Sequence, residues 1–269
     1  MKRLLLGLIS VAAVSAVFGA VESSEVSYKL GDQGFRGVVV RDTSVSAERP
    51  GVLVVPEYWG VNDYAKRRAA MLAEMGYVAF VADMYGDGKV TTDSKQAGAW
   101  AGQVKSDRVM MRQRAQAALD QLKAQPGVDA NRLAAIGYCF GGTTVLEMAR
   151  GDMPVKGVVS FHGGLEPGNA PTAGKIHPAV LVLHGAADPH APAASVTALQ
   201  AELTKAGADW YLTAYGDAVH AFSNPDAGTD PSKGAAYNEK ADKRSWTAMK
   251  SFLEELFDKQ KLIATEGHK

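Results

Sequence analysis

The stretch Gly137-Tyr138-Cys139-Phe140-Gly141-Gly142 places the only cysteine of the 269-residue chain at the centre of a G-x-C-x-G-G turn. The apolar run 132–136 before the turn favours a buried strand, and the segment 143–150 after it favours a helix. Glycines tolerate close backbone approach around a strained central residue, so this arrangement would present Cys139 as a nucleophile. The helix start would favour its thiolate. A lone cysteine can also pack as a small apolar side chain, but the glycine frame argues against that interpretation.

The composition indicates an ordinary globular protein, with 46% hydrophobic and 22% charged residues. The length suits one large α/β domain, residues 21–269, with a full core. Nucleic-acid binding is unsupported, because 29 basic residues balance 29 acidic ones and no basic block stands out. A single cysteine and scattered histidines form no recognisable zinc site.

The first twenty residues are typical of a secretory signal peptide. Two basic residues, Lys2 and Arg3, precede an apolar run from Leu4 to Phe18, and small residues close it. The run is short for a membrane span of about 20 residues, so a retained anchor is the weaker alternative. We therefore expect residues 1–20 to be removed and the protein to be exported to the bacterial periplasm without stable membrane insertion. A free thiol kept in an oxidising compartment suggests that it is used.

Short apolar runs alternate with segments of helical period after residue 50, which is the pattern of βαβ units and a mostly parallel sheet. We expect strands at 35–40, 52–55, 78–82, 133–136, 155–161, 180–184 and 210–215. We expect helices at 64–75, 109–125, 143–150, 195–206 and 236–257. A sheet covered on both faces carries its site residues on the loops that follow the C-terminal ends of the strands.

Two further residues follow predicted strands and complete a candidate triad. Asp188 lies in a turn after the strand 180–184, and His220 lies in the loop after the last strand. The order nucleophile, acid, histidine is the chain order of α/β-hydrolases. In this interpretation Cys139 attacks an acyl carbon, His220 accepts its proton and later activates water, and Asp188 orients the imidazole. The other histidines are interpreted as core-edge or loop residues, His162 and His184 among them.

Glu57 directly follows the predicted strand 52–55 and would face the same rim, although its position alone is also typical of a surface glutamate. The segment around it could donate backbone N–H groups to an oxyanion hole. Aromatic residues near the predicted rim are candidates for a wall around a small acyl group, although such residues more often belong to a core: Tyr58, Trp59, Tyr85, Trp100 and Phe222.

Five ordered motifs resemble the dienelactone hydrolase family and cover roughly residues 35 to 257. They are Pro56-Glu57-Tyr58-Trp59-Gly60-Val61-Asn62, Ala82-Asp83-Met84-Tyr85-Gly86, Gly137-Tyr138-Cys139-Phe140-Gly141-Gly142, His184-Gly185-Ala186-Ala187-Asp188-Pro189 and His220-Ala221-Phe222. The resemblance implies an α/β-hydrolase fold with Cys139, Asp188 and His220 as its triad, and Glu57 as a carboxylate that interacts with the cysteine during its activation. It also implies an oxyanion hole made by the backbone N–H groups of Tyr58 and of Phe140 or Cys139, with no metal or organic cofactor.

The arginines with which dienelactone hydrolases bind the substrate carboxylate have no clear counterpart. The family carries one four residues after the catalytic histidine, where this chain has Asn224. The other falls after Tyr85-Gly86, where the chain offers only Lys89 and Lys95. Arginine suits bidentate carboxylate recognition better than lysine. We therefore expect an altered acid-binding pocket that includes Asn224. Neutral esters should react at least as well as carboxylated ones, unless Lys89, Lys95 or Arg108 supplies the cation.

These observations predict a cofactor-independent hydrolase of a small ester or lactone that acts through a thioester on Cys139. Two alternatives stay open: acyl transfer to an alcohol or amine on the same triad, and a non-catalytic binding protein on a hydrolase fold. Competent residue types at every catalytic position argue against the second alternative. The natural substrate and the oligomeric state are left open.

Overall fold

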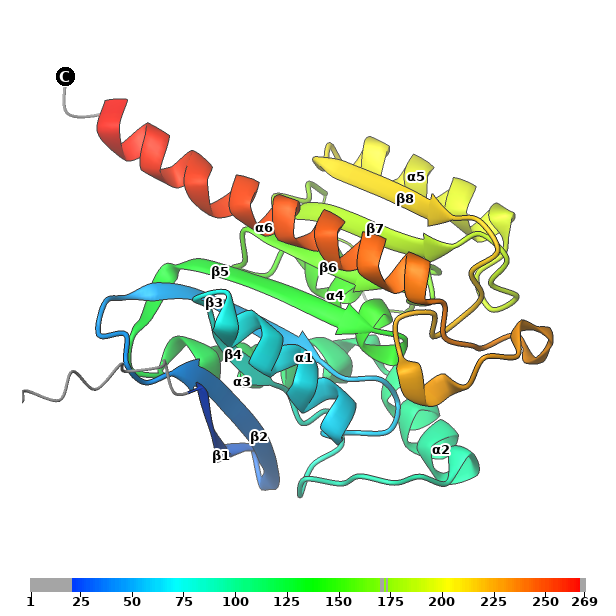
Figure 1. The fold of residues 1–269 in the computed structure, drawn as a ribbon, viewed down its shortest axis with the longest axis horizontal. Helices are drawn as coiled ribbons and strands as arrows, with labels where there is room; N and C mark the ends of the chain where they lie inside the picture. Colours follow the sequence, from blue (N-terminus) through cyan, green and yellow to red (C-terminus); the bar gives the residue numbers. More distant parts are fainter. Residues whose placement is uncertain (1–20, 170–171, 173, 267–269) are drawn as a thin grey trace, which may run out of the picture.

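The computed structural model describes residues 21–169, 172 and 174–266, so the predicted signal peptide at residues 1–20 lies outside the described residues. An eight-stranded sheet runs through the molecule in the order β1-β2-β4-β3-β5-β6-β7-β8 (Figure 1). Its strands are β1 (Val21–Leu30), β2 (Gln33–Asp42), β3 (Arg49–Val55), β4 (Val78–Val81), β5 (Val128–Tyr138), β6 (Gly157–Phe161), β7 (Ala179–Gly185) and β8 (Trp210–Tyr215).

Helices connect most of the parallel strands along the chain, with two of them between β4 and β5 and none described between β6 and β7. They are α1 (Asp63–Glu74), α2 (Ser94–Lys105), α3 (Arg108–Lys123), α4 (Phe140–Arg150), α5 (Ala193–Lys205) and α6 (Glu239–Glu266), with short 3-10 helices η1 (Pro225–Ala227) and η2 (Pro231–Lys233). Strands β3 to β8 pair in parallel. Strands β1 and β2 form an antiparallel hairpin that joins the sheet through β4. The predicted α/β fold with a mostly parallel central sheet is therefore confirmed.

Helices cover both faces of the sheet. Helices α1 and α6 lie on one face, and α3, α4 and α5 lie on the other (Figure 1). Strand β3 shows why, because Val52 and Val54 pack into the core on the α1 side while Leu53 and Val55 pack into the core on the α3 side. Successive side chains of a strand point to opposite faces. Each such side chain stabilises the fold by about 1.5 to 3 kcal/mol on burial.

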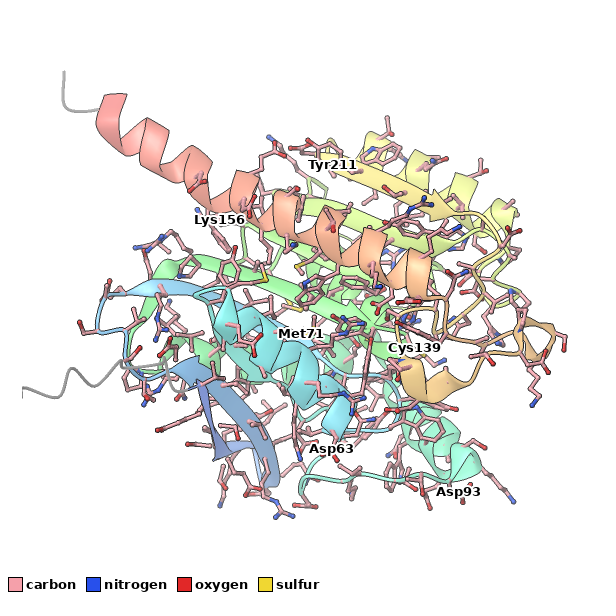
Figure 2. The ribbon with its side chains drawn as sticks, in the orientation of Figure 1. Asp63, Met71, Asp93, Cys139, Lys156 and Tyr211 are labelled. Atoms are coloured by element: carbon pink, nitrogen blue, oxygen red, sulfur yellow. The ribbon has the colours of Figure 1, made fainter. Side chains whose placement is uncertain are left out.

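The carboxyl ends of the parallel strands meet at one edge of the sheet. Figure 2 shows Cys139 at this edge, whereas Lys156, which precedes β6, lies at the opposite edge. The loops after β3, β5, β7 and β8 therefore converge around the cysteine. In the part of the chain that the structure describes, no helix has both the length and the apolar character needed to cross a membrane.

Candidate functional site

A sharp turn between β5 and α4 carries Cys139. Its backbone lies at φ 52° and ψ −112°, a conformation that a residue with a side chain rarely adopts. A Cβ atom at Gly137 would lie 2.1 Å from the carbonyl oxygen of Gly141, so only glycine fits there. The strand, turn and helix predicted from the sequence are thus present, and they hold the thiol at the rim of the sheet.

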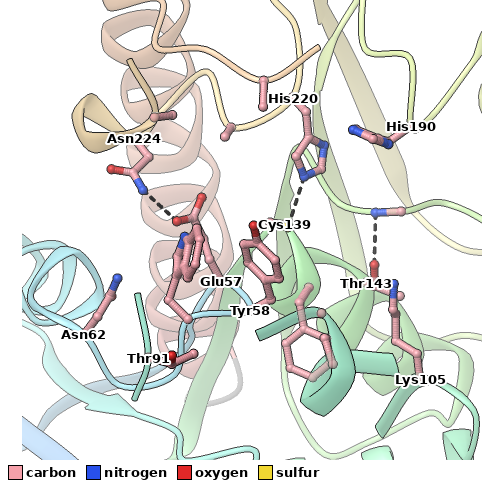
Figure 3. A pocket seen from close by; sticks show the side chains of 18 of the residues that line it. Glu57, Tyr58, Asn62, Thr91, Lys105, Cys139, Thr143, His190, His220 and Asn224 are labelled. Carbon is pink, nitrogen blue, oxygen red and sulfur yellow. Dashed lines mark hydrogen bonds between the residues drawn. The ribbon is translucent and has the colours of Figure 1, made fainter. Parts of the chain in front are cut away.

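Three side chains from different loops meet at this turn. The Sγ of Cys139 lies 3.0 Å from Nε2 of His220, and the dashed line in Figure 3 marks this contact. The Nδ1 of His220 lies 2.8 Å from Oδ2 of Asp188. Asp188 follows β7 and His220 follows β8, as the sequence predicts. A thiol in contact with an imidazole that a buried carboxylate orients is the arrangement that activates a nucleophile.

The electrostatics of these three groups favour a charged histidine. Burial opposes the imidazolium, but the charge of the Cys139 sulfur and the contact with Asp188 outweigh it and hold the pKa of His220 well above its usual range. Burial likewise favours the neutral form of Asp188, but the hydrogen bond from His220 prevails and lowers the pKa of that carboxyl. The contacts with Cys139 and Asp188 therefore favour the imidazolium form of His220.

Glu57 is a buried carboxyl group in the same pocket, with 2% of its surface exposed. Burial raises its pKa to about 7, although the hydrogen bond from Asn224 and the charge of His220 oppose the shift. The amide Nδ2 of Asn224 donates to Oε2 of Glu57 at 2.6 Å (Figure 3). The Oδ1 of Asn224 also accepts from the backbone N–H of Asp226, which fixes the amide's orientation. Asn224 thus lies in the pocket as predicted, and it holds Glu57 through a neutral contact.

The backbone amides at the turn divide into two kinds. The N–H of Cys139 donates to the carbonyl of Phe161 at 3.0 Å and to Nδ1 of His162 at 3.1 Å. Among the described residues, the N–H groups of Tyr58 and Phe140 donate no hydrogen bond. Both of these residues line the pocket. Cys139 and Phe140 were the two residues of this turn whose amides were considered as oxyanion donors. Of these two amides, only that of Phe140 is therefore unpaired.

His162 contacts Cys139 directly, although the sequence favoured a core-edge or loop histidine there. Its Nδ1 accepts from the amide of Cys139, so Nε2 carries the proton and donates to Oγ of Ser223 at 2.8 Å. The Ser223 hydroxyl in turn lies 2.8 Å from the hydroxyl of Tyr64. Burial, reinforced by the charge of His220, lowers the pKa of His162 well below its usual range. A neutral histidine therefore links the turn to the segment that follows His220.

The sequence contained a signal for this contact. His162-Gly163-Gly164 follows β6, which ends at Phe161 and pairs directly with β5. Its start must therefore lie beside the nucleophile turn at the same sheet edge. The partner Ser223 could not be identified in this way, because it lies 61 residues further along the chain.

One pocket of about 1040 Å³ opens onto the triad. Five residues predicted for the site besides Cys139 and His220 line it, namely Glu57, Tyr58, Trp59, Phe140 and Asn224. Arg108, one of the three alternative cations named from the sequence, also lines the pocket. Other lining residues were not predicted as pocket residues, and they include Asn62, Lys105, Thr143, Glu166 and His190. Within the described ranges, no group of three or more His, Cys, Asp and Glu side chains could hold a metal ion.

Three predicted pocket aromatics are placed behind the pocket wall. Among the described residues that line the pocket, Tyr85, Trp100 and Phe222 are not found. The ring of Tyr85 packs between those of Trp100 and Phe140, with both pairs of centroids 5.5 Å apart. Phe222 is fully buried, 5.1 Å from the ring of His162. Their role as pocket residues needs correction, because Tyr85 and Phe222 are buried in the core that supports the site and the half-buried Trp100 packs against that core.

Tyr85 nevertheless acts on the site through one contact. Its hydroxyl donates to the carbonyl oxygen of Tyr58 at 3.0 Å. The loop that carries Tyr85 is itself held by Asp83, whose side chain accepts from the backbone N–H groups of Tyr85, Gly86 and Gly88 at 2.9 Å each. This loop therefore fixes the segment in which the unpaired Tyr58 amide lies.

Comparison with known proteins agrees with this architecture. Residues 35–257 match the sequence profile of the dienelactone hydrolase family. The chain belongs to this family. It is thus a dienelactone hydrolase-like hydrolase, and the resemblance noted in the sequence is confirmed at the level of the family.

Three relatives illustrate the range of this similarity. A crystal structure of P91, a dienelactone hydrolase-like promiscuous phosphotriesterase from metagenomic libraries, is 44% identical, covers 88% of this chain and 99% of its own, and superposes with a TM-score of 0.84. An uncharacterized Caenorhabditis elegans protein, K02A2.1, is 38% identical over 55% of this chain and 94% of its own length. The α/β-hydrolase MGS-M1 from a deep-sea metagenome, 20% identical over 90% of this chain and 100% of its own with a TM-score of 0.65, shares the fold.

Proposed function

We propose that this hydrolase cleaves a small ester or lactone, with Cys139 as its nucleophile and a thioester acyl-enzyme as its intermediate. The observation that supports this most strongly is the continuous line of contacts from Cys139 Sγ through the His220 imidazole to Asp188, at 3.0 and 2.8 Å. The family match supports hydrolysis as the reaction class. The chemistry needs no group beyond these side chains and two backbone amides.

In the first half-reaction the Cys139 thiolate attacks the carbonyl carbon of the bound ester. The carbonyl oxygen becomes an oxyanion, and the unpaired N–H groups of Tyr58 and Phe140 are the donors that would stabilise it. The tetrahedral intermediate collapses, the bond to the alcohol oxygen breaks, and the His220 imidazolium gives that oxygen its Nε2 proton. The acyl group is then bound to sulfur as a thioester.

In the second half-reaction a water molecule attacks the thioester carbon. His220, neutral after the first step, accepts a proton from this water through Nε2. The second tetrahedral intermediate expels the Cys139 thiolate and releases the carboxylic acid. The resting pair of thiolate and imidazolium is restored, and Asp188 keeps the ring orientation throughout.

Glu57 has a separate part in this proposal. Its carboxyl group, with a pKa of about 7, lines the same pocket as Cys139 and can be neutral or charged near neutral pH. In its charged form it adds a negative charge to the pocket and so disfavours the Cys139 thiolate. In its neutral form it adds no negative charge beside the thiolate. The neutral partner Asn224 suits this exchange, because it does not fix Glu57 as an anion in the way an arginine would.

Hydrolysis of p-nitrophenyl acetate tests the proposed function. We expect release of p-nitrophenol and free acetate, and we expect iodoacetamide to abolish both as it alkylates Cys139. Product analysis in the presence of added alcohol separates hydrolysis from acyl transfer, since a transferase would give the acetylated alcohol. Turnover that full alkylation leaves unchanged would exclude Cys139 as the nucleophile, and no turnover of any ester would favour the non-catalytic alternative.

We further propose that the protein is exported and loses its N-terminal segment. The support is the basic start and apolar run of residues 2–18. The expected mature N-terminus lies between Gly19 and Glu22, and mass spectrometry of the protein from a periplasmic fraction of its native cells measures it. A chain that retains Met1 and is found in the cytosol would refute export.

A further inference from the structure

Arg108, the first residue of α3, is a buried cation in the wall of the catalytic pocket. Only 8% of its surface is exposed, and it lines the same cavity as Cys139. Its side-chain stem packs against the backbone of Gly168, where an added Cβ would lie 2.0 Å from Cγ of Arg108. Its backbone N–H donates to Oδ1 of Asn169 at 3.0 Å. These contacts fix the side chain against the pocket wall.

The guanidinium of Arg108 has no anionic partner within the described residues. Its Nε is buried without a hydrogen-bond partner, and among the described residues its side chain makes one weak hydrogen bond, from Nη1 to the sulfur of Met111 at 3.5 Å. A guanidinium stays protonated in proteins. A buried charge without a partner is costly, so its retention in this pocket points to a partner that arrives with the ligand.

The nearby carboxylates are engaged elsewhere. Glu147 is fully buried between Arg112, at 2.7 Å, and Arg150, at 3.2 Å. Glu166 lines the pocket, but its Oε1 accepts from the hydroxyl of Ser195. Neither carboxylate forms an ion pair with Arg108 in the structure.

A second cation lies near Arg108 at the junction of α2 and α3. Lys105, the last residue of α2, also lines the pocket and forms no ion pair among the described residues. Figure 3 shows Lys105 beside Thr143, on the opposite side of Cys139 from Glu57 and Asn224. This end of the pocket therefore carries two cations against the single carboxylate of Glu166.

We propose that Arg108, assisted by Lys105, binds a carboxylate of the substrate, so that the enzyme selects esters or lactones that carry a free acid group. This inference rests on the proposed function and names its substrate class. It replaces the expectation that neutral substrates react at least as well as carboxylated ones. It also assigns the acid site to the start of α3, away from the positions after His220 and after Tyr85-Gly86 where the family resemblance placed its arginines.

The test compares kcat/KM for esters with and without a carboxylate. Two pairs cover both sides of the scissile bond: p-nitrophenyl hydrogen glutarate and its methyl ester, and 4-acetoxybenzoate and its methyl ester. We expect the acid of at least one pair to be preferred by about tenfold or more. In Arg108→Leu this ratio should fall by about tenfold, and Arg108→Lys should restore part of it. The matched control Lys95→Gln, on an exposed part of α2 outside the pocket, should leave the ratio unchanged.

Two outcomes overturn the inference and leave the proposed function standing. One is a ratio near one for both pairs in the wild type while Cys139-dependent hydrolysis persists. The other is a preference that survives in a folded Arg108→Leu protein. If Arg108→Leu does not fold, two other measurements decide. The preference for the acid should be smaller in Lys105→Gln than in the wild type, and it should decrease as salt is added, because both changes weaken binding of an anion to these cations.

A binding measurement separates failure of this inference from failure of the proposed function. Glutarate should raise the thermal unfolding midpoint of Cys139→Ala protein, and the neutral analogue glutaramide should not. The shift should disappear in the double variant that also carries Arg108→Leu. If no ester is hydrolysed, the proposed function fails. The shift in the unfolding midpoint still decides whether the pocket binds a carboxylate. No shift with glutarate would overturn the inference.

Discussion

Replacement of Cys139 by alanine is expected to lower kcat/KM for ester hydrolysis by about a thousandfold or more while the fold stays intact. The expected loss is large because no other described side chain in contact with His220 Nε2 can form an acyl intermediate. The turn should survive, since alanine keeps the backbone N–H that bonds to Phe161 and His162 and has the same Cβ as cysteine. Steady-state kinetics with p-nitrophenyl acetate measure the loss of kcat/KM. Thermal unfolding of the same protein measures whether the fold is intact.

Cys139→Ser is the matched control for this variant. A hydroxyl is a far weaker acid than a thiol and needs a stronger base, and a neighbouring Glu57 disfavours further negative charge. We therefore expect the serine variant to be poor, even though its side chain has nearly the same size. A Cys139→Ala protein with wild-type turnover would show that the reaction uses another nucleophile.

Replacement of Glu57 by glutamine is expected to change the pH dependence of stability. Burial raises the pKa of Glu57 to about 7 from an ordinary value of 4.5. Between these values the folded protein holds a proton that the unfolded chain has lost, so the free energy of unfolding falls as pH rises and levels off above a pH of about 7. The fall attributable to Glu57 is about 3 kcal/mol, and a neutral glutamine cannot show it.

Urea unfolding at a series of pH values measures this effect. The Glu57→Gln variant should gain stability relative to the wild type by about 3 kcal/mol between pH values of about 4 and about 8. Glu74→Gln, at the exposed end of α1, is the matched control and should show no comparable gain. An equal pH profile for wild type and Glu57→Gln would mean that Glu57 does not titrate in this window.

The fold was largely predictable because most strands and helices carry clear apolar periodicity, and the two missed elements do not. Strand β1 lies at the sheet edge and exposes most of its side chains, so its alternation of polar and apolar residues is weak. Helix α2 buries only Ala97, Ala101 and Val104, and its two glycines lower its helix propensity. Both elements depend on contacts with distant segments.

The site was predictable where chain order determines position. Cys139, Asp188 and His220 follow strands whose carboxyl ends meet at one edge, so their convergence follows from the topology. The direction of a loop side chain does not follow from topology. Phe222 lies two residues after His220, yet its ring is buried in the core. Arg108 lies far from the motifs, and only packing against Gly168 places it in the pocket.

The central claim is that the acyl group passes through the sulfur of Cys139. The most direct measurement is mass spectrometry of protein quenched with acid during turnover of p-nitrophenyl acetate, followed by peptide mapping. The account predicts one acetyl group per chain, on the peptide that contains Cys139, removable by neutral hydroxylamine as a thioester is. An acetyl group on another residue, or turnover of the wild type with no acyl-enzyme at any quench time, would contradict it.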